Sequence, residues 1–560
     1  MNDSFIWKTD RPWPNQRLNT GAIIGHTTDT STRIWLRTGR TGGFILLLYP
    51  LEMESCDSFH ASLKAVPFTR IGDLPNEVTV YEFKVEDHGR DTTHVENITG
   101  LEPLTEYGYA LFGMNASLPR ILLGHDRKMT FRTMPDTTAP MSFGFYSCHM
   151  PYRKTLFGNT ELVNIEMWDC FNEVLDRHYK EDLRFIIGGG DQVYTDGVAT
   201  LDIWSFLNKV MRKEDGKVLP GKDDMVSWYR DIYRGYWGFA SLRKAFSSYP
   251  TYMIWDDHEL GDGWGSHFLK QGKNDELHEI LPDWKDSGLT RTEVLSLVND
   301  MKDAGCQVYD EYQHSHNPDA AEKGQYDYST RFDCHAFYFL DGRGHRDVNK
   351  ASDRILGADQ MARFEQWLSE LDTEITRYVF IVSAVPLVHL CSLVANADDN
   401  MLADLAGIQD DLRDAWEHEL HDDERRRLLR LLFDAADRGV KISILSGDVH
   451  TSAAFRLKDD ETGSIIYQLT SSAITYNKPR LLGWLLGKTV AEEGHSEDGY
   501  TFERLALYTD SNFSLVKVDP ERDRVMFQLY GQQIVSDPFE EEEDVAMTHA
   551  IARLELNFNA

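Results

Sequence analysis

The sequence predicts a mixed α/β protein in which an all-β sandwich precedes a larger domain of alternating strands and helices. Short β-rich runs separated by turn residues fill the stretch from about residue 21 to 133, as is typical of a sandwich. From Met141 onward, strand-like apolar runs alternate with segments whose apolar residues recur at helical spacing, which indicates βαβ units and a parallel sheet. With 560 residues, the chain is long enough for two such domains.

The amino-terminal stretch resembles immunoglobulin and fibronectin type III sandwiches. Leu101-Glu-Pro-Leu-Thr-Glu-Tyr-Gly-Tyr109 is similar to the fibronectin segment in which a tyrosine packs at the corner of the sandwich. We therefore expect a β-sandwich domain over residues 18–135 and a catalytic domain over residues 140–535. Within the latter, polar and mostly helical residues at about 265–333 are expected to form an insertion over the active face, and residues 536–560 a peripheral tail.

Three apolar runs end abruptly in aspartate or histidine, after Phe185-Ile-Ile-Gly-Gly-Gly190, Tyr252-Met-Ile-Trp255 and Ile442-Ser-Ile-Leu-Ser-Gly447. Ligands of open α/β sheets collect outside the carboxyl ends of the strands, so we expect these polar residues to converge. They are Asp191, Asp256, Asp257, His258, Asp448 and His450.

A site of this composition can bind metal ions. A carboxylate at a rigid strand end, such as that of Asp191, can bridge two cations that lie roughly 3.5–4 Å apart. Cys148 also follows a strand-like run, and its thiolate, like imidazole, suits zinc or iron, whereas carboxylates accept calcium or magnesium. The sequence therefore predicts a site for metals of unlike hardness, suited to phosphoester hydrolysis because cations offset phosphate charge.

The ordered motifs resemble those of the PhoD-like alkaline phosphatases of the calcineurin-like metallophosphoesterase superfamily. The main matches are Ser147-Cys148, Gly190-Asp191-Gln-Val-Tyr194, Trp255-Asp-Asp-His-Glu259 and Gly447-Asp448-Val-His450. Weaker matches are Asp341-Gly-Arg343, Leu356-Gly-Ala-Asp-Gln360, Asp414-Ala-Trp416 and Thr470-Ser-Ser472. The resemblance implies a four-layer αββα sandwich for the larger domain.

The resemblance also implies a role for each matched residue. Asp191 would bridge the metals, and Cys148 and Tyr194 would ligate an iron-like ion. The residues that would complete the metal site are Asp257, Asp448 and His450. His258 would protonate the leaving oxygen, a role that suits histidine near neutral pH. The metals implied are Fe(III) and Ca(II), with zinc, manganese or magnesium as alternatives; His149 stands where many relatives have glutamine, which leaves the first metal open.

Several of these residues have a structural alternative. Cys148 could fill the core, since free cysteine is often buried. Tyr194 could pack under its loop, and Asp196 is interpreted as a turn residue or helix cap. Arg343 could clamp phosphate through its planar guanidinium or form an ion pair with a neighbouring acid.

Composition narrows the choice of function. With 58 Lys and Arg against 91 Asp and Glu, the net charge of −33 opposes binding to nucleic acids or anionic membranes. No signal peptide, twin-arginine motif or membrane-spanning run is seen, so we expect a cytoplasmic protein.

The sequence thus predicts a phosphoester hydrolase in which metal-bound hydroxide attacks phosphorus and His258 acts as the general acid. The alternatives are a phosphodiesterase or phospholipase D-like activity in the same site, or a non-catalytic metal-binding adaptor. The oligomeric state stays open.

Overall fold

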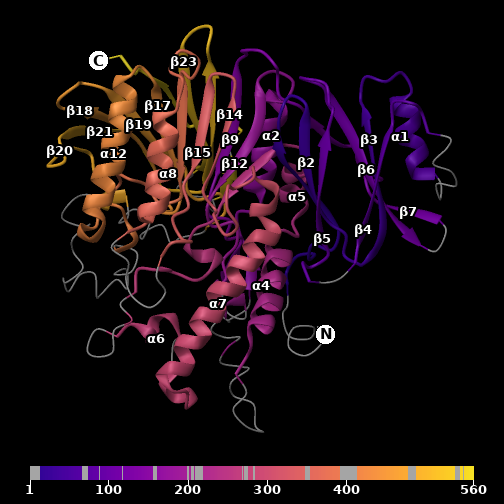
Figure 1. Cartoon of the computed structure of the whole chain (residues 1–560), viewed down its shortest axis with the longest axis horizontal. Coiled ribbons are helices and arrows are strands. Elements are labelled where there is room, and N and C mark those ends of the chain that lie inside the picture. The colour runs from indigo at the N-terminus through magenta and orange to yellow at the C-terminus, as the bar shows by residue number, and fades with distance from the viewer. Residues whose placement is uncertain are drawn as a thin grey trace.

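The computed structural model describes residues 13–65, 74–86, 89–115, 118–155, 160–197, 201–203, 207, 219–267, 269, 275–281, 284–346, 354–390, 413–476, 487–535, 543–546 and 548–559. The prediction of a mixed α/β protein is confirmed, because helices and several sheets share the chain. In Figure 1 the amino-terminal strands, in indigo, lie at one end of the molecule, and the strands β17 to β21 lie at the other.

Two sheets contain the strands that the sequence places around the site. The first has the order β13-β12-β9-β22-β23-β24, with β25 also paired to β23, and its strands β9, β12 and β13 are parallel. Its strands are β9 (Met141–Tyr146), β12 (Leu183–Gly189), β13 (Thr251–Ile254), β22 (Asn512–Asp519), β23 (Arg524–Val535), β24 (Glu543–Ala546) and β25 (Ala552–Leu556).

The second sheet has the order β14-β15-β16-β17-β19-β18-β21-β20, and β15, β16, β17 and β19 are parallel. Its strands are β14 (Tyr328–Phe332), β15 (His335–Phe339), β16 (Tyr378–Ser383), β17 (Lys441–Ser446), β18 (Ser452–Asp459), β19 (Ile465–Thr470), β20 (Glu493–Ser496) and β21 (Tyr500–Tyr508). A short hairpin of β10 (Tyr152–Lys154) and β11 (Thr160–Leu162) stands apart from both sheets.

A single aromatic cluster joins the two sheets. Phe143 and Phe185, from the first sheet, stack with ring centroids 5.1 Å apart. Phe337 and Phe380, from the second, approach Phe143 edge-on at 5.4 and 5.1 Å. Offset and edge-on contacts are the favoured geometries of aromatic pairs, so this cluster fixes how the sheets face each other.

Helices pack on the outer side of each sheet. Apolar residues of α2 (Glu166–His178), α4 (Lys222–Tyr236), α5 (Ala240–Phe246) and α7 (Arg291–Tyr312) form one core with β9, β12 and β13. Residues of α8 (Gly357–Ser369) and α12 (Asp422–Asp437) form another core with β16 and β17. The shorter helices are α6 (Leu277–Ile280), η3 (Asp257–Glu259), η4 (Trp284–Ser287), η5 (His314–His316) and η6 (Glu419–His421).

The amino-terminal stretch contains two sheets, of order β1-β2-β5 and β4-β3-β6-β7, with β8 paired to β6. Their strands are β1 (Gly21–Thr27), β2 (Ser31–Arg37), β3 (Gly42–Pro50), β4 (Thr79–Val85), β5 (Thr93–Thr99), β6 (Glu106–Asn115), β7 (Leu118–Leu123) and β8 (Met129–Arg132). The stretch is not all-β, because α1 (Cys56–Ala65) follows β3. Cys56, Phe59 and Leu63 recur at helical spacing and pack on β3 and β6, which explains the helix.

The charged segment that leads into β17 is helical only in part. Among its described residues, α12 begins at Asp422, after a turn and the short helix η6. Before α12, Asp414 contacts Arg343, and Glu417 accepts hydrogen bonds from the backbone of His389 and Leu390.

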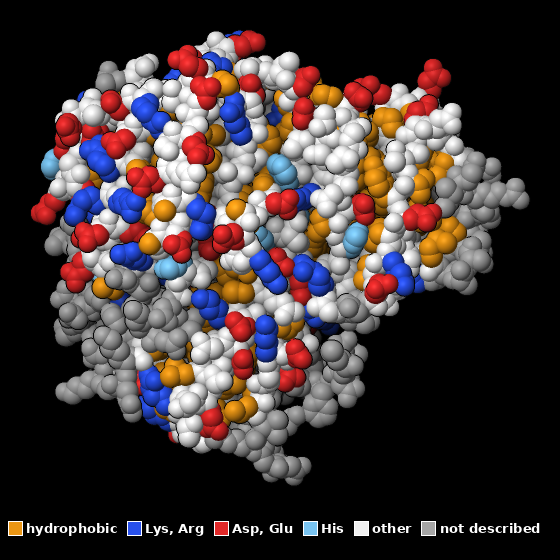
Figure 2. Space-filling view, viewed as in Figure 1, with side chains coloured by type: hydrophobic (Ala, Val, Ile, Leu, Met, Phe, Trp, Pro, Cys, Tyr) orange, Lys and Arg blue, Asp and Glu red, His pale blue; other side chains and the backbone are white. Residues whose placement is uncertain are grey.

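On the face in Figure 2, acidic and basic side chains are interspersed rather than gathered in one field. Within the described residues, no helix combines the length and the apolar character that crossing a membrane requires.

Replacing Phe143 by alanine should lower the free energy of unfolding by about 3–5 kcal/mol, because it opens a cavity between the sheets. Chemical denaturation followed by tryptophan fluorescence measures the change. Ile375→Ala is the control: this side chain is 45% exposed, so we expect a change within about 0.5 kcal/mol. Equal effects of the two substitutions would contradict the role of the aromatic cluster.

Candidate metal centre

The strand ends bring the predicted ligands together. Among the described residues, five groups of side chains have ligand atoms within 4.8 Å of one another, and Asp191 belongs to three of them. These three groups are Cys148, Asp191 and His450; Asp191, Asp256, Asp257 and Asp448; and Asp191, Asp257 and His258. Asp191 therefore occupies the shared position that a bridging carboxylate requires.

The backbone at these strand ends adopts unusual conformations. Cys148, Asp191, Asp448 and His450 have φ angles of 55°, 55°, 61° and 50°, in the left-handed region that non-glycine residues seldom adopt. Such conformations cost roughly 1–3 kcal/mol each and concentrate at functional sites. The surrounding fold thus holds four proposed ligands in strained positions.

Two glycines allow the strand ends to approach each other. A Cβ atom on Gly190, whose φ is 107°, would lie 2.9 Å from the Cβ of Asp256. A Cβ atom on Gly447 would lie 2.5 Å from that of Ser147. Glycine is therefore required where the end of β12 meets that of β13 and where the end of β17 meets that of β9.

One side of the cluster carries softer donors. The Cys148 thiol donates to Asp191 Oδ2 at 3.4 Å and lies 3.1 Å from Ser472 Oγ. The Tyr194 hydroxyl donates to the same Asp191 oxygen at 3.1 Å and lies 3.1 Å from His450 Nε2. Burial and the nearby Asp191 charge raise the pKa of both Cys148 and Tyr194 well above their ordinary values.

The other side consists of crowded carboxylates. Burial, and then the charges of neighbouring aspartates, raise the pKa of Asp448 well above its ordinary value. Burial also raises the pKa of Asp191, although His258 opposes the shift, and brings that of Asp256 to about 7 against the opposing charge of Arg343. Each of these pKa values is raised because the positive groups near the carboxylate do not offset its burial.

These carboxylates fit cations. Asp191 Oδ1, Asp256 Oδ2 and Asp257 Oδ1 are buried and make no hydrogen bond within the described residues. Buried polar atoms are normally satisfied, and an ion is one of the recognised explanations when they are not. Oxygen donors beside a thiol, a phenol and an imidazole form a set that suits two different metals.

His258 is held by a carboxylate whose role was not predicted. Its Nδ1 lies 2.8 Å from both oxygens of Asp196, and its ring packs against that of Tyr194 with centroids 4.1 Å apart and planes tilted by 31°. Burial disfavours the imidazolium, but the charges of Asp196, Asp257 and Asp191 outweigh it and raise the pKa of His258 well above its ordinary value. Asp196 therefore orients His258 in addition to shaping a turn. In the sequence, only its position five residues after Asp191 could have indicated this role.

Arg343 is fully buried, and its donors face carboxylates. Nε donates to Asp256 Oδ1 at 2.5 Å, and the two terminal nitrogens donate to Asp414 at 2.8 and 2.5 Å. One terminal nitrogen also donates to the carbonyl of Trp264 and the other lies 3.6 Å from Asp257 Oδ1. This geometry favours the ion-pair alternative over direct contact with phosphate.

Other neighbours of the cluster were not given a role by the sequence. Glu259 accepts backbone hydrogen bonds from Asp191, Gln192 and Asp256. Tyr476 stacks on His450 with centroids 3.6 Å apart. His149 turns away from the cluster: Trp168 Nε1 donates to its Nδ1, and its Nε2 lies 3.1 Å from the carbonyl oxygen of Tyr236.

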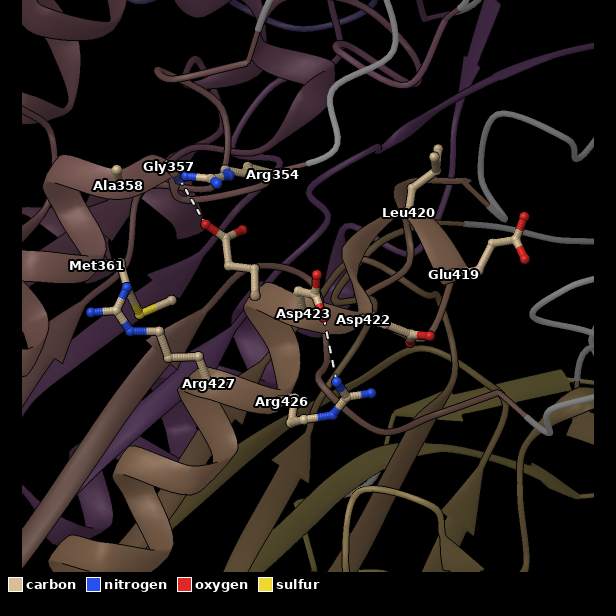
Figure 3. A pocket seen from close by; sticks show the side chains of 11 residues that line it. Arg354, Gly357, Ala358, Met361, Glu419, Leu420, Asp422, Asp423, Arg426 and Arg427 are labelled. Atoms are coloured by element: carbon tan, nitrogen blue, oxygen red, sulfur yellow. Dashed lines mark hydrogen bonds and ion pairs between the residues drawn. The ribbon is translucent and has the colours of Figure 1, made fainter.

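A cavity of about 550 Å³ lies between the starts of α8 and α12 and shares no residue with the three groups (Figure 3). Arginines alternate there with acidic residues. Glu424 already accepts the backbone N–H groups of Ile355, Leu356 and Gly357 at the start of α8. The backbone N–H groups at this helix terminus therefore already have a hydrogen-bond acceptor within the chain.

Comparison with known proteins identifies relatives of this chain. The model of the PhoD-like phosphatase family matches residues 164–482. Uncharacterized protein YGR266W of Saccharomyces cerevisiae is 23% identical over 338 residues, which are 51% of this chain and 47% of that protein. The chain thus spans about half the length of this curated relative.

Two solved structures share the fold. That of PhoD has a TM-score of 0.58 at 14% identity, over 98% of this chain and 94% of that one. Purple acid phosphatase PPD1 from yellow lupin (Lupinus luteus) seeds has a TM-score of 0.50 at 11% identity, over 92% of this chain and 72% of that one.

Replacing Arg343 by methionine should destabilise the protein by about 3–5 kcal/mol, because it leaves the buried charges of Asp256 and Asp414 uncompensated. Chemical denaturation measures the loss. Arg524→Met, which removes the more exposed pair with Glu555, should cost less than about 1 kcal/mol. Unchanged stability together with a raised KM for a phosphoester would instead support contact between Arg343 and phosphate.

Proposed function

Because the chain belongs to the PhoD-like phosphatase family, we propose that it hydrolyses phosphoesters at the strand-end cluster with the help of metal ions. One observation carries this proposal: Asp191 shares ligand-atom contacts with a thiol and an imidazole on one side and with three carboxylates on the other. Such a set is suited to two cations that share a carboxylate.

The residues proposed to hold the metals follow from this division. Asp191 would be shared by the two ions, and Cys148, Tyr194 and His450 would hold the first ion, for which Fe(III) is the first candidate. Asp257 and Asp448 would hold the second ion, for which Ca(II) is the first candidate; zinc, manganese and magnesium are alternatives. When bound, the ions supply positive charge to the phosphate and lower the pKa of water.

His258 is proposed to protonate the leaving oxygen from Nε2. The Asp196 carboxylate keeps a proton on Nδ1 and fixes the orientation of the ring, and the tilted ring of Tyr194 packs against it. After the Nε2 proton has moved to the leaving oxygen, the neutral imidazole retains its hydrogen bond to Asp196. Arg343 acts through Asp256 and Asp414 and keeps this side of the cluster in place.

The finer features of the fold are part of the proposal. The helices outside the two sheets support a four-layer αββα sandwich over residues 140–535, and the amino-terminal sheets support an immunoglobulin or fibronectin-like domain over residues 18–135. The described elements α6, η4 and α7 fall within the expected insertion at 265–333.

Phosphodiesterase or phospholipase D-like activity is the alternative within the same site. A non-catalytic adaptor is disfavoured, because an adaptor has no need of a general acid such as His258. A cytoplasmic location and the absence of nucleic-acid binding stay predictions.

Metal removal tests the proposal. After treatment with a chelator, the full chain should lose hydrolysis of a phosphomonoester, a phosphodiester or both, and added metal should restore it. The ratio of the two restored rates decides between monoesterase and diesterase. Absence of turnover on both substrates with every metal tried would leave the adaptor as the better account.

Replacing His258 by alanine should lower kcat by roughly 10²- to 10⁴-fold, because the leaving oxygen loses its proton donor. Metal content, measured by mass spectrometry, should stay near that of the wild type. His278→Ala, at a side chain that is 61% exposed, is the control and should change neither quantity. Loss of metal from His258→Ala would make His258 a ligand instead.

A further inference from the structure

The carboxylate of Glu259 joins the ends of the two strands that carry most of the aspartates. Its Oε2 accepts hydrogen bonds from the backbone N–H of Asp191, at 3.2 Å, and of Asp256, at 2.8 Å. Its Oε1 accepts from the backbone N–H of Gln192 at 2.7 Å. Glu259 is 1% exposed, so these bonds form in a region screened from water.

Glu259 is in turn oriented by Gln313, the capping residue that directly follows α7. Gln313 Nε2 donates to Glu259 Oε1 at 2.9 Å and also to the Tyr233 hydroxyl at 2.9 Å. Gln313 is fully buried, and the sequence separates it from Glu259 by more than 50 residues. The position of the carboxylate therefore depends on how α7 is placed.

The amino-terminal sheet fixes the end of α7. Trp35 Nε1, on β2, donates to the carbonyl oxygen of Glu311 at 2.7 Å, and its ring lies 5.4 Å from that of Tyr312. Arg33, on the same strand, donates to the carbonyl oxygen of Asn317.

Asn317 continues this connection to the edge strand β13. Its Nδ2 donates to the carbonyl oxygen of Met253 at 2.8 Å, and its Oδ1 accepts from the Met253 N–H at 3.0 Å. Both backbone groups are thus satisfied on an edge that no further strand of the sheet covers. Met253 precedes Asp256 by three residues, so Asn317 also supports the strand β13 that leads to this aspartate.

We propose that Glu259 and Gln313 form a positioning pair for the metal centre, and that the amino-terminal sheet braces this pair through the end of α7. The inference rests on the proposed function in so far as the cluster binds cations. Neither residue contacts substrate or metal; each acts through the backbone that carries Asp191 and Asp256. The amino-terminal strands thereby contribute to metal affinity as well as to folding.

Gln313→Leu tests the pair, because it removes the amide while nearly conserving side-chain size. Binding of Mn²⁺ and of Ca²⁺, each alone, to the chelator-treated full chain should weaken roughly 10- to 100-fold, as is usual when a group that supports metal ligands is lost. Calorimetric titration, well below the unfolding temperature, measures this. Glu259→Gln should weaken binding at least as much; if it fails to fold, Gln313→Leu still decides.

Two controls separate positioning from general destabilisation. Tyr233→Phe removes only the other acceptor of Gln313, and Gln366→Leu removes an exposed glutamine amide that donates to Glu370 at 2.7 Å. Both should bind the two cations as the wild type does. Wild-type affinity in Gln313→Leu, or equal losses in the controls, would overturn the positioning role.

Trp35→Phe tests the brace, because it removes the indole donor and keeps an aromatic ring. We expect cation affinity between those of Gln313→Leu and the controls. A lowered unfolding temperature with unchanged affinity would limit the sheet to a stabilising role. Cation binding without hydrolysis by the wild type would count against the proposed function but not against the positioning pair, whereas a wild type that bound neither cation would overturn both.

Discussion

Mutual repulsion among buried carboxylates is the constraint on which the rest of this structure depends. Asp191, Asp256, Asp257 and Asp448 come from the ends of three strands and place their oxygens within a few ångströms of one another. Bringing several such groups out of water is costly unless positive charge compensates them. Two sources of positive charge can compensate the cluster: buried arginine side chains and bound metal ions.

Buried arginine side chains supply positive charge on one side of the cluster. Arg343 and Arg346 are both fully buried and contact Asp414, and Arg343 also contacts Asp256. On the opposite side the structure provides a thiol, a phenol and an imidazole around Asp191 instead of an arginine. This side of the cluster therefore suits the second source of positive charge, which is a bound metal ion. The left-handed backbone at four proposed ligands indicates that the fold tolerates strain to keep this geometry.

The sequence predicted the strands around the site well, because a buried parallel strand followed by glycine and aspartate is a local pattern. The runs before Asp191, Asp256 and Asp448 became β12, β13 and β17, and the ligands predicted at their ends lie together. Pairings between distant segments could not be predicted from local patterns. Asp196 was assigned to a turn because nothing in its own loop indicates His258, and the bond between Glu259 and Gln313 joins residues that are 54 positions apart. The helix α1 was also missed, since it is short and lies amid strands.

The central claim is that Asp191 bridges metal ions at this cluster. Elemental analysis of the purified full chain, wild type beside Asp191→Asn, tests it most directly, because the substitution keeps the shape of the side chain and removes the charge that two ions would share. The account predicts about two cations per chain in the wild type and depletion of both in the variant. An unchanged metal stoichiometry in Asp191→Asn would contradict it.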